Sequence, residues 1–331
     1  MAILVTGGAG YIGSHTVYAL LESGTTEEVI IVDNLSTGHR GAVHPKAKFY
    51  EIDIRDRAAL DKLFAQEHIE GVIHFAASSQ VGESMHVPLQ YYENNLSGTL
   101  TLIQAMLAAD VKHIVLSSTA AVYGEPQTVP IPEDAPTVPT SCYGETKLAM
   151  ERMLSWAQGA HGLNYIALRY FNAAGAHPSG KIGEAHDPET HLIPVILQVP
   201  NGKRASVSVY GTDYPTKDGT CVRDYIHVTD LADAHVLALT SLRKGGPSDI
   251  YNLGNGVGFT VQEVIDLART VTGDPIPEEK SPRRPGDPAK LVASSQKAKT
   301  ELGWNPRYES LETIIQSAWT WHKNHPNGYD K

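Results

Sequence analysis

The 331-residue chain contains few cysteines, no excess of positive charge and no long apolar run. Cys142 and Cys221 are the only cysteines, so we expect no disulfide framework and a reducing compartment, the cytoplasm. The formal net charge of −10 argues against nucleic acid as a partner, because contacts with phosphates need a basic face. No apolar segment approaches the length of a membrane span, so no membrane association is expected. The composition is that of a soluble globular protein with one large or two moderate domains.

The N-terminal segment combines a short apolar run with a glycine-rich turn and a helical pattern. Residues 2–6 read as a strand, residues 11–21 read as a helix, and Gly7, Gly10 and Gly13 lie in or beside the turn between them. Such a turn lets the backbone approach a pyrophosphate and directs free N–H groups and the positive end of the helix at it. A lone glycine pattern also fits an ordinary tight turn. Because the first strand belongs to the core, we expect no signal peptide.

A carboxylate at the end of the next expected strand separates these two interpretations. Residues 29–32 read as a strand, and Asp33 follows it, twenty residues after Gly13. A carboxylate at this spacing binds the ribose hydroxyls of the adenosine of a dinucleotide. The same charge repels a 2′-phosphate. The pattern therefore predicts NAD, rather than NADP, as the cofactor.

Strand-like and helical patterns alternate through the first half of the chain. The expected strands are 48–52, 71–76, 113–118 and 164–170, and the expected helices between them are 57–67, 89–109 and 143–161. This alternation is typical of parallel strands joined by helical crossovers. It predicts an α/β fold with a doubly wound parallel (Rossmann) sheet.

The alternation breaks after about Asn172. Residues 199–220, rich in Pro, Gly and Asp, read as loops, whereas 230–242 and 260–271 return to helical spacing. We expect an NAD-binding Rossmann domain at 1–175, which the chain re-enters around 221–254. Residues 176–331 are expected to form mainly a smaller mixed α/β domain that binds the substrate.

Tyr143 and Lys147 are spaced for one face of a helix that begins after Ser141, a possible N-cap. A free tyrosine titrates near ~10, and a nearby ammonium and the positive nicotinamide favour the phenolate and lower its pKa. Tyr143 can then remove a hydroxyl proton while hydride leaves the same carbon. A surface pair on a helix is the alternative interpretation of the motif.

Hydroxyl side chains stand at the end of the strand expected at 113–118. In an open α/β sheet, ligands bind beyond the carboxyl ends of the strands. Thr119 is expected to hydrogen-bond both Tyr143 and the reacting oxygen of a substrate, and Ser118 to pack or to cap the backbone. A polar strand end that satisfies its own backbone is the alternative.

These motifs together resemble the extended short-chain dehydrogenase/reductase family, and within it the UDP-glucose 4-epimerase family. The resemblance rests on the glycine run, Asp33, Tyr143-x-x-x-Lys147 and residues 169–172. It continues along the whole chain in segments 6–15, 74–76, 81–84, 91–92, 94–95, 175–180, 223–228, 251–254, 325–326 and 328–329.

The resemblance implies a set of residues that hold NAD throughout the reaction cycle. Those expected on the cofactor are Gly7, Gly10, Tyr11, Ile12 and Gly13 at the pyrophosphate, Asp33, Asn34, Ser36, Thr37, Asp53 and Ile54 on the adenosine side, Phe75, Ala76 and Ala77 along the nucleotide, and Asn94, Lys147 and Tyr170 near the nicotinamide ribose and ring.

The resemblance also implies a UDP-hexose substrate and its contacts. The expected substrate residues are Thr119, Tyr143, Asn172, Leu192, Ser208, Tyr210, Arg223, Arg284, Asp287 and Leu291, with the two arginines on the diphosphate. Tyr143, Lys147 and Thr119 are the expected catalytic residues. The implied reaction is reversible 4-epimerisation of UDP-glucose and UDP-galactose, by transient C4 oxidation with bound NAD, rotation of the 4-keto-sugar and hydride return. A homodimer through helices 89–109 and 143–161 is also implied.

Several alternatives stay open at this stage. A 4,6-dehydratase needs an acid and a base beside the hydroxyl residue, where this chain has Ala120 and Ala121, which cannot transfer protons, so the sequence argues against dehydration. A 4-epimerase for UDP-N-acetylhexosamine, UDP-pentose or UDP-uronic acid is not excluded. Leu291 stands where a tyrosine restricts some family members to hexoses and smaller residues admit N-acetylated sugars. A catalytically inactive NAD-sensing regulatory protein is the alternative of a different class.

No metal site is expected from the sequence. His177, His186 and His191 lie in one loop region without a recognised ligand spacing, so loop or surface roles are expected for them. His191 stands where other epimerases have asparagine, and packing beside the substrate is its expected role.

Overall fold

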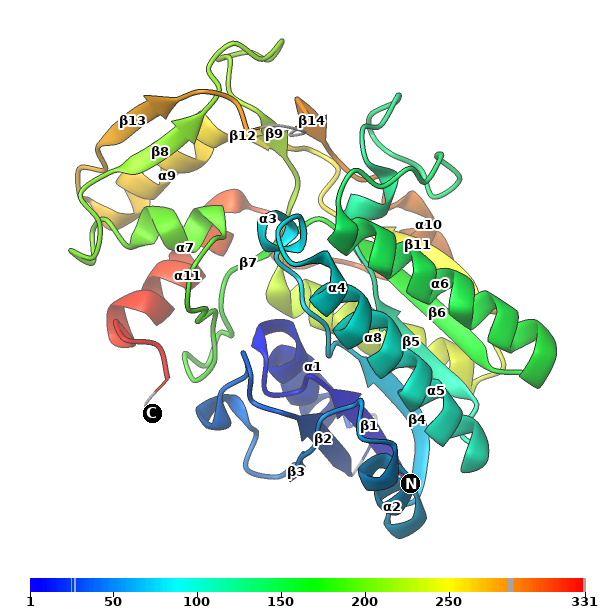
Figure 1. The fold of residues 1–331 in the computed structure, drawn as a ribbon. Coiled ribbons are helices and arrows are strands. Elements are labelled where there is room, and N and C mark those ends of the chain that lie inside the picture. Colours follow the sequence, from blue (N-terminus) through cyan, green and yellow to red (C-terminus); the bar gives the residue numbers. More distant parts are fainter. Residues whose placement is uncertain (25, 27, 285–287, 330–331) are drawn as a thin grey trace.

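A computed structural model describes residues 1–24, 26, 28–284 and 288–329 of the chain. Its centre is a seven-stranded sheet with the order β11-β6-β5-β4-β1-β2-β3 (Figure 1). The strands are β1 (Ala2–Thr6), β2 (Val29–Asp33), β3 (Lys48–Glu51), β4 (Ile69–His74), β5 (His113–Ser117), β6 (Asn164–Tyr170) and β11 (Asp249–Leu253). All neighbours in it pair in parallel. The predicted doubly wound α/β class is confirmed.

Helices cover both faces of this sheet, and alternate residues of each strand supply two separate apolar cores. Leu4 packs with α2 (Arg57–Gln66), α5 (Gly98–Ala108) and α6 (Cys142–His161) on one face. Its neighbours Ile3 and Val5 pack with α1 (Tyr11–Glu22), α8 (Val228–Arg243) and α10 (Gln296–Glu301) on the other. Burial on both faces explains why β1 and β2 read as unbroken apolar runs.

The expectation of one regular helix at 89–109 is wrong. The structure has α4 (Pro88–Tyr91), a π-helical turn η2 (Tyr92–Ser97) and then α5. The side chain of Asn95 accepts a hydrogen bond from the Ser78 N–H at 2.8 Å and donates to the Ser78 carbonyl at 3.1 Å. The wider turn directs this buried amide toward the loop after β4, and π-turns of this kind are frequent at functional sites.

The remainder of the chain forms a second, smaller layer of short strands and helices above the carboxyl ends of the main sheet (Figure 1). Its strands are β7 (Asn172–Ala174), β8 (Val207–Tyr210), β9 (Val222–Arg223), β10 (Tyr225–His227), β12 (Phe259–Thr260), β13 (Glu278–Ser281) and β14 (Lys290–Leu291). Its helices are α7 (Leu192–Leu197), α9 (Val261–Thr272) and α11 (Leu311–Asn324), and shorter turns elsewhere are η1 (Arg40–Ala42), α3 (Val81–Ser84) and η3 (Ala120–Tyr123).

Residues 199–220 are not loop throughout, as the sequence suggested, because they contain β8. This strand pairs in parallel with β13, which lies far along the chain, so no local pattern announces it. The segment from α8 to β11 packs with the main sheet, since β11 is its edge strand beside β6. In the described residues, no helix has the length and apolar character that crossing a bilayer requires.

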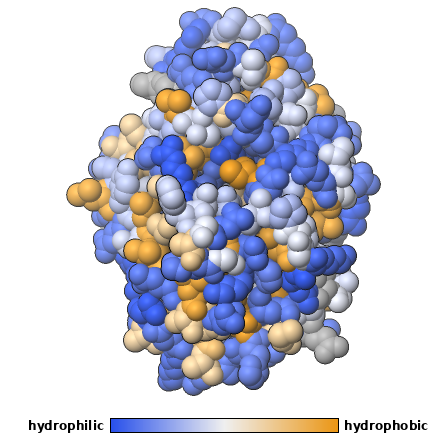
Figure 2. Space-filling model, turned by 90° about the vertical axis from the view of Figure 1, so that its right-hand side faces the viewer, coloured by the Kyte–Doolittle hydropathy of each residue, from blue (hydrophilic) through white to orange (hydrophobic). Residues whose placement is uncertain are grey.

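Large apolar side chains are exposed on the side of the molecule that carries α4, α5 and α6. Leu89 is 80% exposed, Leu100 is 45% exposed and Trp156 is 81% exposed. Figure 2 shows this side, where hydrophobic residues lie interspersed among polar ones.

Candidate active site

The glycine turn brings β1, the start of α1 and the end of β4 within van der Waals contact. A Cβ on Gly13 would lie 2.1 Å from the Gly7 carbonyl oxygen, and one on Gly7, where φ is +72°, would lie 2.7 Å from the Ala76 nitrogen. Gly10 precedes α1, and no side chain caps the first turn of that helix. The first N–H groups of α1 therefore have no side-chain acceptor at the N-cap, which fits the pyrophosphate of a dinucleotide.

Asp33 lies beside this turn, at the carboxyl end of β2. Its carboxylate is buried and accepts hydrogen bonds from the N–H of Ala9 at 3.0 Å and of Leu35 at 2.9 Å. Burial raises the pKa of Asp33, and these two donors partly oppose the rise. The carboxylate is held in one orientation next to the turn, which is the arrangement that ribose recognition needs.

The residues expected on the adenosine side lie next to one another beyond β2 and β3. The Asn34 amide donates to Asp53 at 3.2 Å, and Arg55 donates twice to the same carboxylate, at 2.9 and 2.7 Å. Hydrogen bonds from Arg55 hold the pKa of Asp53 well below its ordinary value. Ser36 and Thr37 lie in the turn after Asn34.

On the other side of the glycine turn, the backbone N–H groups of Phe75 and Ala76 both donate to the Thr6 carbonyl, at 2.9 and 3.1 Å. Ala77 follows in the same loop after β4. Asn94, in the π-helical turn, donates to the Ser78 hydroxyl at 3.1 Å, so η2 and this loop are joined. Residues expected along the nucleotide therefore line one edge of the sheet.

Tyr143, Thr119 and Lys147 lie together at the carboxyl ends of β5 and β6. Ser141 is the N-cap of α6, as predicted, and accepts from the Gly144 N–H at 3.1 Å. The Tyr143 N–H donates to the Ser84 hydroxyl at 3.1 Å, a contact that the sequence did not indicate. All three predicted catalytic side chains are buried.

The chain alone does not lower the pKa of Tyr143. Burial raises it to about 12, and a hydrogen bond with the Thr119 side chain opposes this rise. Burial also lowers the pKa of Lys147 to about 8, partly offset by Glu151. The expected stabilisation of the phenolate must therefore come from positive charge brought into the site, such as that of an oxidised nicotinamide.

Ser117 connects the lysine to Tyr170. Its carbonyl accepts from the Lys147 ammonium at 2.8 Å, and its hydroxyl lies 2.6 Å from the Tyr170 hydroxyl. Burial is the main cause of the raised pKa of Tyr170, and proximity to Tyr143 adds to it. The sequence placed Ser117 at a strand end but assigned it no partner.

A buried ionic network behind these residues was missed by the sequence analysis. Glu151 accepts from the Arg169 guanidinium at 2.9 and 2.6 Å and from the Ser118 hydroxyl at 2.5 Å. Arg169 also donates to the Tyr123 hydroxyl at 2.9 Å. Ser118 is thus neither a backbone cap nor an apolar packing residue. The only local signal was the position of Glu151, four residues after Lys147 on α6.

The predicted substrate residues form two groups in the smaller layer. Leu291 and Arg223 are paired neighbours on β14 and β9, and Asn172 donates through both its backbone N–H and its amide to the Asp224 carbonyl, at 3.1 and 2.9 Å. Leu291 also packs against the apolar cluster that contains Val122 of η3. Through this cluster it is close to the segment that follows Thr119.

The second group lies on β8 and in the segment after β13. The Arg284 guanidinium stacks over the Tyr210 ring, 4.0 Å from its centroid, and Ser208 lies two residues earlier on β8. Leu192 opens α7 and packs against the apolar core of this layer. Asp287 lies outside the described residues.

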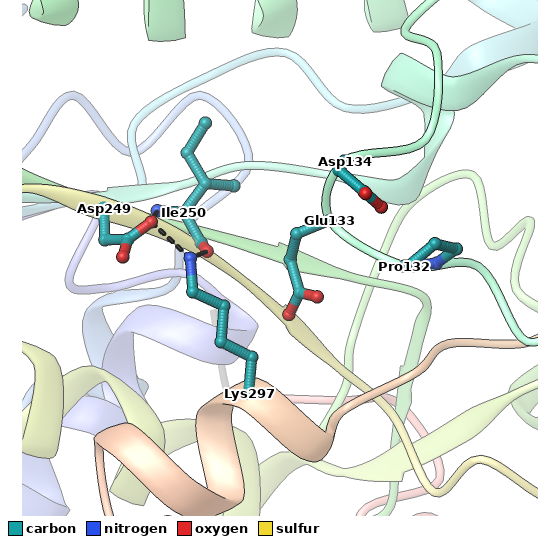
Figure 3. A pocket seen from close by; sticks show the side chains of 6 residues that line it. All are labelled: Pro132, Glu133, Asp134, Asp249, Ile250 and Lys297. Carbon is teal, nitrogen blue, oxygen red and sulfur yellow. Dashed lines mark hydrogen bonds and ion pairs between the residues drawn. The ribbon is translucent and has the colours of Figure 1, made fainter.

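A separate pocket of about 360 Å³ lies outside this arrangement, near the edge strand β11 (Figure 3). It is lined by Pro132, Glu133, Asp134, Asp249, Ile250 and Lys297, of which none is a predicted site residue. Lys297 is ion-paired with Asp249, and Glu133 accepts from the Asn252 N–H at 2.9 Å. These groups are partnered within the protein, so this pocket is not the candidate active site.

In protein without a bound nucleotide, Lys147→Met is expected to be more stable than the wild type at pH 7. The folded chain lowers the lysine pKa from 10.5 to about 8, so between these values the unfolded chain binds more protons and wild-type stability rises with pH. Burying the charged lysine therefore lowers the free energy of unfolding of the wild type by up to about 3 kcal/mol. This loss is largest below pH 8 and vanishes above pH 10.5.

Urea unfolding at pH 7 and pH 10.5 measures this difference, with Lys62→Met on the exposed side of α2 as the control. A stability difference that does not change with pH would contradict the assigned burial penalty.

Comparisons with known proteins agree with this geometry. The family model described as "NAD dependent epimerase/dehydratase family" matches residues 3–254. A UDP-glucose 4-epimerase of Halalkalibacterium halodurans is 62% identical over 329 residues, covering 99% of this chain and 98% of that protein.

Solved structures are similar over the same length. A crystal structure of a UDP-glucose 4-epimerase has a TM-score of 0.98 and 56% identity, with both chains fully covered. The Bifidobacterium longum UDP-glucose 4-epimerase, solved with NAD⁺ and UDP, has a TM-score of 0.93 and 41% identity, covering 99% of this chain and 100% of the other.

Proposed function

This chain belongs to the NAD dependent epimerase/dehydratase family, and on that premise we propose that it is an isomerase that interconverts UDP-glucose and UDP-galactose with bound NAD. The observation that carries the proposal is the buried contact between Tyr143 and Thr119, beside Lys147, at the edge of the sheet where the glycine turn opens. A regulatory protein that only senses NAD has no need of these three side chains together.

The residues of the turn fit NAD. Side chains at Gly7 or Gly13 would clash with the backbone, the first turn of α1 has no side-chain cap, and Asp33 is held at the end of β2. NAD supplies the reversible oxidation at C4 of the sugar, so the reaction needs no further redox partner. We assign Asn94, Lys147 and Tyr170 to the nicotinamide side of the site. Asn94 is bonded to Ser78 in the loop after β4, and Lys147 and Tyr170 are both bonded to Ser117 at the end of β5.

Tyr143 is the proposed acid and base. The Thr119 hydroxyl accepts from the Ala121 N–H at 3.1 Å, which leaves its own proton to donate to the Tyr143 oxygen. This bond favours the phenolate, and the positive charge of oxidised nicotinamide favours it further. Tyr143 then takes the C4 hydroxyl proton and returns it when the opposite face of the sugar is presented.

The smaller layer is proposed to hold the nucleotide part of the substrate and to leave the sugar free to turn. Arg223 and Arg284 are assigned to the diphosphate, because a guanidinium offers a fixed fork of donors to phosphate oxygens. Tyr210 and Ser208 are assigned to the uracil side, and Leu291 to the space beside the hexose. We also propose that residues 1–175, which the chain re-enters around 221–254, form the NAD-binding domain. Residues 176–331 are proposed to form mainly the smaller domain that binds the UDP-sugar.

The direct test is a proton NMR time course of the purified chain with UDP-galactose and no added cofactor. Conversion to UDP-glucose is expected, since NAD is retained through the cycle. A parallel reaction with UDP-N-acetylgalactosamine measures whether the space at Leu291 admits the N-acetyl group. Protein that contains NAD but converts neither substrate would exclude both hexose activities and leave a pentose or uronic acid as the substrate.

We further propose that the active form is a cytoplasmic homodimer in which α4, α5 and α6 face a second copy of the chain. The apolar residues exposed on this side, among them Leu89, Leu100 and Trp156, support this face. Both cysteines are free thiols, which supports a reducing compartment.

Replacing Leu100 with glutamate is expected to shift the protein from dimer to monomer at micromolar concentration, because a charge would be buried between two apolar faces. Sedimentation equilibrium measures the shift, and Val257→Glu, at an exposed residue away from these helices, is the control. A wild-type protein that sediments only as a monomer would contradict the proposed interface.

A further inference from the structure

Four metal-ligating side chains meet between β7 and α7, and none of them has a role in the proposed proton transfer. Glu184, His186, Glu189 and His191 each offer one ligand atom, and these four atoms lie within 4.8 Å of one another. The histidines alone show no recognised ligand spacing. The two glutamates complete the set Glu-x-His-x-x-Glu-x-His.

The separations of these atoms approach those of a tetrahedral site. His186 Nδ1 lies 3.3 Å from Glu184 Oε1 and 3.6 Å from Glu189 Oε2. His191 Nδ1 lies 2.5 Å from Glu184 Oε1 and 3.9 Å from Glu189 Oε1. Tetrahedral Zn²⁺ with nitrogen and oxygen ligands at 2.0–2.1 Å places its ligand atoms about 3.3 Å apart. Small side-chain movements would therefore accommodate the ion.

The Nδ1 atom of His186 faces both carboxylates of the cluster. This atom is buried and lies within ion-pair distance of both carboxylates, but no hydrogen bond of good geometry satisfies it in the described part of the chain. Buried polar atoms in proteins are nearly always partnered, so this atom requires either a proton shared with the carboxylates or a cation within the cluster. A cation between the four groups would satisfy this atom.

The chemistry of the donors selects the kind of cation. Imidazole nitrogen with carboxylate oxygen suits Zn²⁺, whereas Mg²⁺ and Ca²⁺ prefer oxygen ligands alone. Two carboxylates and two neutral imidazoles also balance a divalent charge. We propose that Glu184, His186, Glu189 and His191 form a Zn²⁺ site.

The ligands are already held by the surrounding protein. Glu189 Oε1 accepts from the N–H groups of Thr190 and His191 at 2.8 and 2.9 Å. The Glu184 side chain is only 3% exposed, and its backbone carbonyl accepts from Trp321 of α11 at 3.1 Å. Supporting hydrogen bonds of this kind orient metal ligands.

Four protein ligands leave no open position, so the site is structural rather than catalytic. The His186 ring lies edge-on to the Tyr11 ring at 6.2 Å, and the Tyr11 hydroxyl donates to the Gly175 carbonyl at 2.6 Å. His39 lies 2.7 Å from the Ala185 carbonyl. The ion would therefore tie α11 and this loop to the glycine turn of the main sheet.

A metal-free cluster is the competing state. Burial alone would lower the pKa of His186, but the facing carboxylates raise it to about 10, so two protonated imidazoles could balance the charge instead. The two states differ in metal content, which is the quantity to measure.

The test is the zinc content of the full-length protein, purified from zinc-supplemented medium and measured by mass spectrometry. About one zinc per chain is expected in the wild type and in His68→Ala, an exposed histidine elsewhere, and less than about a tenth in His186→Ala/His191→Ala. Equal zinc in the wild type and the double variant would mean adventitious binding and overturn the proposal. Metal content is independent of epimerase activity, so this result and the test of the proposed function fail separately.

Two further measurements cover the case in which the double variant does not fold. Cobalt-substituted wild type is expected to show the intense visible absorption of tetrahedral Co²⁺, and Glu189→Gln to lose it. Adding a chelator is expected to lower the Tm of the wild type and of His68→Ala alike. A Tm unaffected by both chelator and added zinc, with no cobalt absorption, would assign the cluster to protonated ion pairs.

Discussion

Replacing Tyr143 with phenylalanine is expected to lower kcat for UDP-galactose about 10³-fold, with NAD still bound and KM little changed. Positioned proton transfer contributes about 10² to 10⁴ in rate, and the variant loses only the hydroxyl that carries the proton. The ring remains to fill its buried place beside Thr119. The NMR assay measures the rate, and absorbance of the released nucleotide after denaturation measures retained NAD.

Tyr251→Phe is the matched control. Tyr251 also lies in the main sheet region and donates from its hydroxyl to Glu301 at 3.1 Å, but it is on the edge strand β11, away from Thr119 and Lys147. Its removal is expected to leave kcat unchanged. A Tyr143→Phe protein that kept its full rate would reject the catalytic assignment and favour the NAD-sensing regulatory alternative.

Glu151→Ala is expected to lower the free energy of unfolding by about 3–5 kcal/mol. The carboxylate is buried and accepts both hydrogen bonds of a bidentate pair with Arg169. Its loss leaves a buried guanidinium without its counter-charge, and breaking a buried pair from one side costs this much. Urea unfolding with NAD present measures the difference.

A double-mutant cycle separates the pair from the loss of packing. Glu151→Ala/Arg169→Met is expected to be more stable than Glu151→Ala, because no uncompensated charge remains. The exposed helix pair Arg57 and Asp61 is the control, and Asp61→Ala is expected to cost less than about 1 kcal/mol. Additive effects of the two substitutions at 151 and 169 would show that the pair is not coupled.

The same network offers a structural reason for the position of Thr119. Ser118 is bonded to Glu151 on α6, while its neighbour Thr119 contacts Tyr143 on the same helix. Glu151, Lys147 and Tyr143 thus occupy successive turns of α6, each fixed to the end of β5. Only the four-residue spacing of Tyr143 and Lys147 was predicted from the sequence.

The chain's local patterns were sufficient for the main architecture. Residues 164–170 form β6 as expected, and the expected helix at 57–67 ends one residue earlier, at Gln66. The order of apolar runs, glycines and helical spacing also placed Asp33 and the glycine turn beside each other. These features depend on residues close together in the chain, so periodicity and turn chemistry reveal them.

The sequence by itself determined the sheet, the NAD-type turn and the spacing of Tyr143 and Lys147, because each is written within one or two consecutive elements. Only the tertiary structure decided which distant groups meet. Arg169 joins Glu151 across β6 and α6, Asn95 of the π-helical turn bonds Ser78, and Leu291 pairs with Arg223. It also decided the environment of each group, because the burial that raises the pKa of Tyr143 comes from residues with no local pattern in common.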